Sequence, residues 1–546
     1  MVGPDEELFV ELYTSVEGDF YDFNELLADR GEERITMATF YRRRKSWITG
    51  VVDSKTTVSD EDRITKDLED ARPVAGGTVY SPDRRRGSLK GKRFVFTSAQ
   101  NNSFVHEQFW DSLRVYCEHN GAQLVVGKFK YNKNGYQNNK EKLFYDPKIA
   151  PYVINESMVL EEDINKAVWC GELNISPTAS NPLSGLDSYT HTASSIIPHA
   201  KVQLKSIAVL KGDPTKMLYT TGTCTQRNYI PQKAGQKADF HHVFGAIVVE
   251  IDEYGNAFKR QLIADMNGEF YDLTKYYTPH GVTEIDGVEG INWGDIHAEM
   301  EDPINSQVQW GAGPDSILNV LRPKYQFAND LTDFKARNHH NLKDPMFLAA
   351  MHWNGTGNVE DGMLKAAETL ADMERPWCKT VVVESNHDQA FRRWLSEANI
   401  IQDPENAYYF HKYNMIVHNA IRRGVPIHVF EQAVREQAVL DHTIFLNEDD
   451  SFVIGGHNGI ECGMHGHRGI NGARGTANGF RQLGRKCNLG HAHSACIIDG
   501  IYVAGIACMM DLGYNKGPSS WSVTIIVTYP NGKRALVTIT NGRWRA

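Results

Sequence analysis

The chain has 546 residues, of which 41% are hydrophobic and 23% charged, a composition that excludes dominant disorder, a collagen-like repeat and a disulfide-stapled miniprotein. Its length predicts roughly three or four domains of about 100–200 residues each. The formal charge of −10 argues at first sight against a nucleic-acid partner. However, residues 1–33 hold eleven acids and one base, whereas the other 513 residues carry 57 of each. The net charge therefore decides nothing about the rest of the chain.

The eight cysteines are scattered along the chain with no CxxC pair, which predicts reduced thiols in a cytosolic protein. The N-terminus begins with acids and has neither a basic region nor a long apolar stretch, so no signal peptide is expected. No run reaches the roughly 18–20 apolar residues of a membrane span. We therefore expect a cytoplasmic protein without a membrane partner.

Residues 1–50 predict a small helical unit. The segment DFNELLADRGEE (22–33) places its apolar residues on one side of a helix, and Thr36 is a candidate N-cap for a second helix, TMATFYRRRKSWI. Two short helices around a turn are typical of a helix-turn-helix unit. Its candidate DNA contacts are Arg42, Arg43, Arg44 and Lys45. The alternative is a solvated basic helix face.

Residues 51–92 are polar and end in the basic run RRRGSLKGKR, which predicts a linker. Residues 34–93 as a whole hold fifteen bases and eight acids. From Arg93 onward the pattern predicts a strand (93–100), a helix (106–121) and a second strand (122–131), the beginning of an α/β accessory domain over residues 93–285. This domain contains no nucleotide-phosphate loop, and we expect it to have a structural or substrate-positioning role.

The residues with the clearest chemistry lie between 286 and 546. They form five short clusters in this order: GDIH (294–297), NDLTD (329–333), SNHD (385–388), MHGH (464–467) and GHAH (490–493). Apolar runs precede three of them: YQFA, TVVV and CNL. Because loops that follow parallel strands meet at the C-terminal edge of an α/β sheet, we expect the clusters to lie together.

These clusters supply Asp, Asn and His ligands without thiolates. That mixture suits Mn²⁺, Fe, Zn²⁺ or Mg²⁺ rather than a structural zinc site. A carboxylate can bridge two cations about 3.5–4 Å apart, a separation used for in-line displacement at phosphorus. Any one cluster alone is more often a chance loop. Five of them in order, with four histidines between residues 465 and 493, predict a metal site.

The order DxH, DxxD, NHD, HGH, GHxH resembles the calcineurin-like metallophosphoesterase superfamily, which includes the SbcD-type nucleases. The resemblance covers residues 286–546 and implies an α/β fold, a βαβ sandwich of two mixed sheets flanked by helices. The accessory domain and the helix-turn-helix-like unit would precede it. The resemblance implies that seven residues hold two divalent cations, preferably Mn²⁺ with Mg²⁺ as the alternative: Asp295, His297, Asp330, Asn386, His465, His491 and His493.

The same resemblance implies that Asp330 bridges the two cations and that His387 is the general acid. Asp333, the last residue of DxxD, would orient the His387 imidazole. The chain departs from the family at two flanking positions, where Asn329 and Ser385 replace the usual glycines. These residues shape turns and are not expected ligands, so the departures concern local geometry.

Three features favour a nuclease over a protein phosphatase. The third cluster ends in NHD rather than NHE, the second lacks DRG, and the chain adds a helix-turn-helix-like unit with a basic segment. Candidate phosphate contacts near the site are Arg337, His339, His340, Arg392, Arg393, Arg468 and Arg474. The alternative for each arginine is surface solubility.

Over its whole length the chain also resembles the pre-early DNase family of T-five-type bacteriophages, which is associated with degradation of host DNA early in infection. This resemblance implies double-stranded DNA as the partner, the infected bacterium's cytoplasm as the location, and a homo-oligomer, because relatives commonly assemble. Two other functions stay open: a metallophosphatase or phosphodiesterase acting on a nucleotide or phosphoprotein, and a DNA-binding regulator with a vestigial metal fold.

The C-terminus predicts a β-hairpin around an NG turn at Asn531-Gly532, with SVTIIVTY (522–529) and RALVTIT (534–540) as its strands. We expect this hairpin at a sheet edge and without a catalytic role.

Overall fold

The computed structural model describes residues 5–15, 20–31, 35, 40, 86–132, 143–338, 342, 344–456 and 459–546. The chain divides into two compact units, Met1–Arg85 and Arg86–Ala546. In the first unit, helices α1 (Glu6–Ser15) and α2 (Phe20–Asp29) enclose a small core. Asn24 fixes Ile35 beside them, because its amide accepts from the Ile35 N–H at 2.8 Å and donates to the Ile35 carbonyl at 3.1 Å.

The predicted helix at 22–33 corresponds to α2, which begins and ends earlier, and α1 was not predicted. The predicted second helix with Arg42, Arg43, Arg44 and Lys45 lies outside the described residues, apart from Phe40. Most of the predicted linker also lies outside them. Its last part, predicted to be linker as far as residue 92, instead contains strand β1 (Gly87–Leu89), which pairs with β4.

The second unit contains four sheets. A six-stranded sheet has the order β17-β16-β15-β14-β23-β24. Its strands are β14 (Gly290–Asp295), β15 (Tyr325–Asn329), β16 (Lys379–Val383), β17 (Thr443–Phe445), β23 (Thr524–Thr528) and β24 (Arg534–Thr538). The first four run parallel, and β23 and β24 form an antiparallel hairpin. The predicted C-terminal hairpin is thus confirmed, with β24 at the end of the sheet.

An eleven-stranded mixed sheet has the order β1-β4-β5-β6-β8-β7-β21-β22-β20-β19-β18. Besides β1, its strands are β4 (Ser157–Leu160), β5 (Val168–Cys170), β6 (Ser195–Ile197), β7 (Leu204–Ile207), β8 (Lys216–Thr220), β18 (Val453–Ile454), β19 (Ile460–Glu461), β20 (Lys486–Leu489), β21 (Cys496–Ile498) and β22 (Ile501–Val503). Strand β7 pairs with β21. The predicted boundary at residues 285–286 therefore runs through one shared sheet and one compact unit.

Two smaller sheets complete this unit. The four-stranded sheet contains β2 (Arg93–Gln100), β3 (Gln123–Phe129), β9 (Gly245–Ile251) and β10 (Ala257–Ile263), and the three-stranded sheet contains β11 (Phe270–Asp272), β12 (Lys275–Thr278) and β13 (Gly281–Glu284). The predicted strand–helix–strand unit is confirmed as β2, α5 (Glu107–Asn120) and the parallel strand β3. The helix begins where the His106 side chain accepts from the Phe109 N–H, and it ends at Gly121 in the left-handed conformation.

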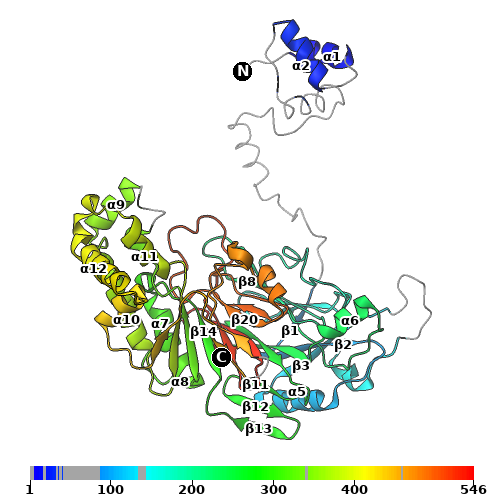
Figure 1. Ribbon diagram of the computed structural model, residues 1–546. Coiled ribbons are helices and arrows are strands. Elements are labelled where there is room, and N and C mark those ends of the chain that lie inside the picture. Colours follow the sequence, from blue (N-terminus) through cyan, green and yellow to red (C-terminus); the bar gives the residue numbers. More distant parts are fainter. Residues whose placement is uncertain are drawn as a thin grey trace. The chain divides into compact units, whose positions relative to one another are not determined.

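The remaining helices of the unit follow in chain order. They are α6 (Lys233–Phe240), α7 (Pro303–Trp310), α8 (Ile317–Leu321), α9 (Pro345–Trp353), α10 (Val359–Met373), α11 (Asp388–Glu397), α12 (Ala407–Arg423), α13 (Val429–Gln437) and α14 (Ala477–Phe480). Short 3-10 helices are η2 (Pro147–Tyr152), η3 (Ala298–Met300), η4 (Lys335–Arg337), η5 (Ile400–Gln402), η6 (Pro404–Asn406), η7 (Ile470–Gly472) and η8 (Arg481–Leu483). Figure 1 shows α7 to α12 gathered on one side of the six-stranded sheet.

Both faces of the six-stranded sheet are buried, because its side chains alternate between two cores. On β23, Ile525 and Val527 belong to the core beneath the helices, whereas Ile526 packs with Tyr502 of the eleven-stranded sheet. Likewise Phe327 of β15 packs with Ile454 of β18. The unit is thus an α/β structure with mixed sheets and helices. Among the described residues, no helix is both long and apolar enough to cross a membrane.

Candidate metal centre

Loops that follow strands bring the predicted clusters together. GDIH follows β14, NDLTD follows β15 and SNHD follows β16, so these three leave the same edge of the parallel sheet. The first two loops continue side by side, because the N–H groups of Ile296 and His297 donate to the carbonyls of Asn329 and Asp330 at 2.9 and 2.7 Å. GHAH follows β20, and the Gly490 N–H donates to the His465 carbonyl at 2.8 Å, which joins the last two clusters.

Six of the seven predicted metal ligands form two groups whose ligand atoms lie within 4.8 Å of one another: Asp295, His297, Asp330 and His493 in one, and Asp330, His465 and His491 in the other. In the first group, His493 Nε2 lies 3.1 Å from Asp295 Oδ2 and 3.3 Å from His297 Nε2. In the second, His465 Nε2 lies 3.2 Å from Asp330 Oδ2. Asp330 belongs to both groups.

The donor atoms fit a cation. Asp295 Oδ1, Asp330 Oδ1 and Asn386 Oδ1 are buried without a hydrogen-bond partner in the described part of the chain. The other carboxylate oxygens of Asp295 and Asp330 face the imidazoles of His493 and His465. Buried polar atoms without partners are costly, and a divalent cation accepts carboxylate, amide and imidazole ligands of this kind. This buried cluster of Asp and His residues could therefore hold a metal ion.

The charges of the cluster favour ionised carboxylates. Burial raises the pKa of Asp330, but the charges of His465 and His387 outweigh this effect and hold the pKa well below its usual range. Burial lowers the pKa of His297, but Asp333 and Asp330 outweigh this effect and raise it to about 9. Burial lowers the pKa of His491 to about 4, which keeps this imidazole neutral. A cation can take the place of the protons that now balance these carboxylates.

The backbone is strained at several of these ligands. Four of the seven have a positive φ: His297 (44°), Asp330 (42°), His491 (68°) and His493 (56°). Non-glycine residues rarely adopt this conformation, and such strain persists where surrounding contacts impose it, often at functional sites. Position 490 requires glycine because the Asp295 side chain lies close to its backbone. A Cβ at this position would lie 2.3 Å from Asp295 Oδ1.

Asp333 contacts both His297 and His387, but with different atoms. Its Oδ1 lies 3.2 Å from His297 Nδ1 and 3.6 Å from His387 Nδ1. The nearest contact of His387 Nδ1 is instead the backbone carbonyl of Asp333, at 3.0 Å. The Asp333 carbonyl thus lies nearest to His387, whereas the Asp333 carboxylate lies nearer to His297. That Asp333 orients His387 stays a prediction.

The two departures from the family pattern have local structural roles. The Ser385 hydroxyl accepts from the Asp388 N–H at 3.1 Å and donates to the Asp388 carboxylate at 2.9 Å, which fixes the first turn of α11. The Asn329 Oδ1 lies 3.3 Å from His465 Nδ1 and helps to orient that ring. Both replacements therefore support neighbouring cluster residues.

Sequence reasoning missed two carboxylates that organise the cluster loops. Glu299 accepts from the N–H groups of Asp333 and Phe334 at 2.6 and 2.9 Å and from the Thr332 hydroxyl at 2.6 Å. Asp388 accepts from the Thr332 N–H at 3.1 Å. The spacing S-x-x-D at 385–388 was a usable signal for Asp388. Glu299 gave none, because its partners lie more than 30 residues away.

The candidate phosphate contacts are scattered. Arg337 is 8% exposed and forms two hydrogen bonds to Asp403, at 2.6 and 2.7 Å, so its guanidinium is committed to a structural ion pair and not to a substrate. Arg392 and Arg468 line one cavity of about 560 Å³ beside α11, where Arg468 pairs with Glu448. The His467 Nε2 lies 3.2 Å from the same Glu448, while the His467 ring centroid lies 5.5 Å from that of His465 and 6.1 Å from that of His491. His339 and His340 lie outside the described residues.

Among known proteins, "Protein A1" of Escherichia phage T5 is 44% identical to this chain over 490 residues, which cover 87% of each protein. No family model matches the chain. No solved structure matches it either.

Proposed function

The chain belongs to the family of protein A1 of Escherichia phage T5, and we propose that it is a metal-dependent DNase of the calcineurin-like metallophosphoesterase type. The observation that carries this proposal is the buried Asp and His cluster at the ends of β14, β15 and β20. Its residues follow the motif order of that superfamily. The proposal includes two divalent cations, with Mn²⁺ preferred over Mg²⁺. Asp330, which belongs to both ligand groups, would bind both cations.

Two bound divalent cations would neutralise charge on the scissile phosphate and activate a water as the nucleophile. The chain's own residues prepare this chemistry. Asp333 lies beside His297 Nδ1, which leaves the His297 Nε2 for the metal, as carboxylates behind ligating histidines commonly do. Asp295 and His493 complete the same group from two other loops.

His387 is the proposed general acid. Its Nδ1 faces the Asp333 carbonyl, which can only accept a hydrogen bond, so Nδ1 carries a proton in every working state. The proton given to the departing sugar oxygen is therefore the one on Nε2. Its ring centroid lies 4.8 Å from that of His297, beside the proposed metal ligands.

The proposed substrate is double-stranded DNA, with Arg392 and Arg468 as candidate phosphate contacts. Arg337 is no longer a candidate, because its guanidinium is paired with Asp403. The relative from Escherichia phage T5 supports a phage origin. The proposal adds that the enzyme degrades host DNA early in infection, in the host bacterium's cytoplasm. A homo-oligomeric assembly and DNA contact by the basic segment at 42–45 remain predictions.

The test is digestion of linear duplex DNA by the full-length protein with Mn²⁺, with Mg²⁺ and with EDTA. Asp330→Asn removes the carboxylate shared by both ligand groups, so we expect cleavage to fall more than about 1,000-fold. Asp315→Asn changes an exposed carboxylate and is the matched control, expected to cleave normally. Cleavage that persists in EDTA or in Asp330→Asn would sink the proposal.

The second candidate function is a metallophosphatase or phosphodiesterase acting on a nucleotide or phosphoprotein, and the same buried cluster supports it. It predicts Mn²⁺-dependent hydrolysis of p-nitrophenyl phosphate that Asp330→Asn abolishes, with duplex DNA left intact. The DNase proposal predicts the opposite preference.

A further inference from the structure

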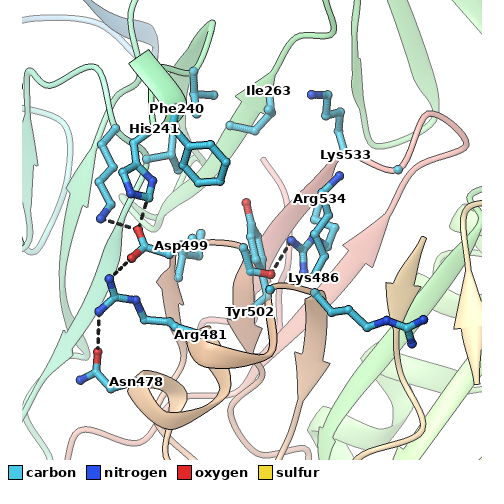
Figure 2. Close-up of a pocket in the computed structure, with 18 of the residues that line it drawn as sticks. Phe240, His241, Ile263, Asn478, Arg481, Lys486, Asp499, Tyr502, Lys533 and Arg534 are labelled. Carbon is cyan, nitrogen blue, oxygen red and sulfur yellow. Dashed lines mark hydrogen bonds and ion pairs between the residues drawn. The ribbon is translucent and has the colours of Figure 1, made fainter. Parts of the chain in front are cut away.

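A second cavity, of about 840 Å³, lies at the other end of strand β20. The strand begins at Lys486, which lines this cavity, and ends at Leu489, directly before the metal-cluster residues Gly490 and His491. Four strand residues at about 3.3 Å each separate the two places by roughly 13 Å along the backbone. Figure 2 shows the cavity residues, which come from α6, η8, the β21–β22 turn and the β23–β24 hairpin.

On one wall of the cavity, two cations share a single carboxylate. Asp499 contacts the ammonium group of Lys201, the guanidinium of Arg481 and, at 3.5 Å, the imidazole of His241. These contacts are drawn as dashed lines on the left of Figure 2. Asp499 therefore offsets part of the positive charge of this wall, and its contacts hold Lys201 and Arg481 in place.

The opposite wall is not balanced. Lys486, Lys533 and Arg534 line it, and within the described residues no carboxylate lies within 4.0 Å of any of them. Arg534 is 5% exposed and is held by the carbonyls of Cys487 and Gly500 at 2.9 and 2.8 Å. Its guanidinium also lies 3.9 Å from the Tyr502 ring centroid. Of the three cations, Arg534 is buried, Lys533 is half-buried and Lys486 is exposed. Three cations that converge in this way favour an anionic ligand.

The mutual repulsion of these groups supports that conclusion. Burial lowers the pKa of Lys486, and the charge of Arg534 lowers it further. Burial likewise lowers the pKa of Lys533, with Lys486 as the next cause. An anion placed among the three groups would relieve the repulsion, and phosphate is the group that Arg and Lys side chains bind best in such sites.

The cavity also offers an aromatic ring to its ligand. Phe240, the last residue of α6, lines the cavity and is 83% exposed. Figure 2 shows this ring above the space between Asp499 and Arg534. Cationic groups that hold a backbone phosphate, with an aromatic side chain on which a base stacks, are the combination that nucleotide-binding and single-strand-binding sites use.

We propose that this cavity is a nucleotide-binding site separate from the metal centre, in which Lys486 and Lys533 hold the phosphate beside the buried charge of Arg534 and Phe240 stacks on the base. The volume suits one small ligand, since such sites occupy about 300–1,000 Å³. The nucleotide unit is either free or part of a DNA strand. The proposal does not require the proposed DNase activity.

The test measures binding to the full-length protein in EDTA, which prevents turnover and removes cations from the metal centre. The probes are dAMP, inorganic phosphate and a 5′-phosphorylated dodecadeoxynucleotide. We expect dAMP to bind at least about fivefold more tightly than inorganic phosphate, because base stacking contributes. Saturable binding of dAMP but not of the oligonucleotide identifies a free nucleotide as the ligand. Tighter binding of the oligonucleotide, with competition by dAMP, identifies a DNA strand.

Three variants test the assigned contacts. Lys486→Gln/Lys533→Gln should weaken dAMP binding by about tenfold for each lysine. The matched control Lys90→Gln/Lys379→Gln removes two exposed lysines outside the cavity and should bind normally. Phe240→Ala should weaken dAMP binding but leave phosphate binding unchanged. Thermal melting checks that each variant is folded.

Three results would overturn the proposal. They are the absence of saturable binding by every probe, equal weakening in the control pair, and phosphate binding as tight as dAMP binding with no effect of Phe240→Ala. None of these results bears on DNA cleavage, so the proposed DNase function would stand even if the cavity bound no nucleotide. Conversely, loss of cleavage in the Asp330→Asn variant does not test nucleotide binding in the cavity.

Discussion

The two ends of strand β20 carry opposite chemistry. At its C-terminal end, carboxylates and histidines converge with buried oxygens that lack hydrogen-bond partners. At its N-terminal end, Lys486, Lys533 and Arg534 converge without a carboxylate of their own. At the C-terminal end, histidine charges offset the carboxylates, and a bound cation would take the place of those protons. At the N-terminal end, no carboxylate of the described residues lies within 4.0 Å of the three cations. The sign of the groups that converge thus indicates the ligand, a cation at one end and a phosphate at the other.

The largest expected effect separates chemistry from binding at the metal end. His387→Gln removes the proposed proton donor but none of the seven proposed metal ligands, so we expect kcat for DNA cleavage to fall by about 10²–10⁴-fold. Mn²⁺ affinity, measured by titration calorimetry, should be unchanged. Loss of Mn²⁺ binding in this variant would instead make His387 a ligand.

Thermal unfolding should separate the two ends. In metal-free protein, a ligand at 100 times its Kd stabilises the folded state by about 2.7 kcal/mol. We expect Asp330→Asn to abolish stabilisation by Mn²⁺ and to keep that by dAMP, with the reverse pattern in Lys486→Gln/Lys533→Gln. Melting curves of both variants with each ligand provide the measurement. If one variant abolished both stabilisations, the two ends would not be independent sites.

A smaller effect is expected from the carboxylate behind the metal ligands. Asp333→Asn keeps the backbone carbonyl that holds His387 but weakens the support of His297. Substitution of a residue that supports a metal ligand typically weakens metal binding by about 10–100-fold. We expect a loss of Mn²⁺ affinity of this size, measured by titration calorimetry. A loss of kcat at saturating Mn²⁺, with affinity unchanged, would return the Asp333 carboxylate to the role of orienting His387.

The last prediction concerns the pH dependence of stability at the metal end. Burial, followed by the charge of Asp330, raises the pKa of Asp388 to about 7. Between pH 4 and 7 the folded state then holds a proton that the unfolded state has lost. The Asp388 carboxyl therefore contributes stability that is present at low pH and is lost as pH rises. Between pH 4 and 7 the free energy of unfolding should fall by about 1.4 kcal/mol per pH unit.

Asp388→Asn should remove that slope from metal-free protein, as measured by urea unfolding at a series of pH values. The exposed Asp315→Asn variant should keep the wild-type slope. An unchanged slope in Asp388→Asn would mean that another group is responsible.

Much of the metal cluster could be predicted because its signals are local. Asp295 ends β14, Asp330 directly follows β15 and Asn386 lies three residues beyond β16, so strand order brings them to one edge. The strand–helix–strand unit at 93–129 was predictable for the same reason, because its apolar pattern and helix ends are written within a few residues. Arg337 was misjudged, because its partner Asp403 lies 66 residues away and no local pattern marks the pair.

The sequence by itself determined the candidate ligands, since motif order and spacing are properties of short segments. Only the tertiary structure decided which atoms of Asp333 serve which histidine, and that residues 93–285 share a sheet with the C-terminal half. Only the tertiary structure, too, assembled the basic cavity, whose Phe240, Lys486 and Lys533 come from three distant segments. Contacts of this kind depend on long-range packing, which a single sequence does not record residue by residue.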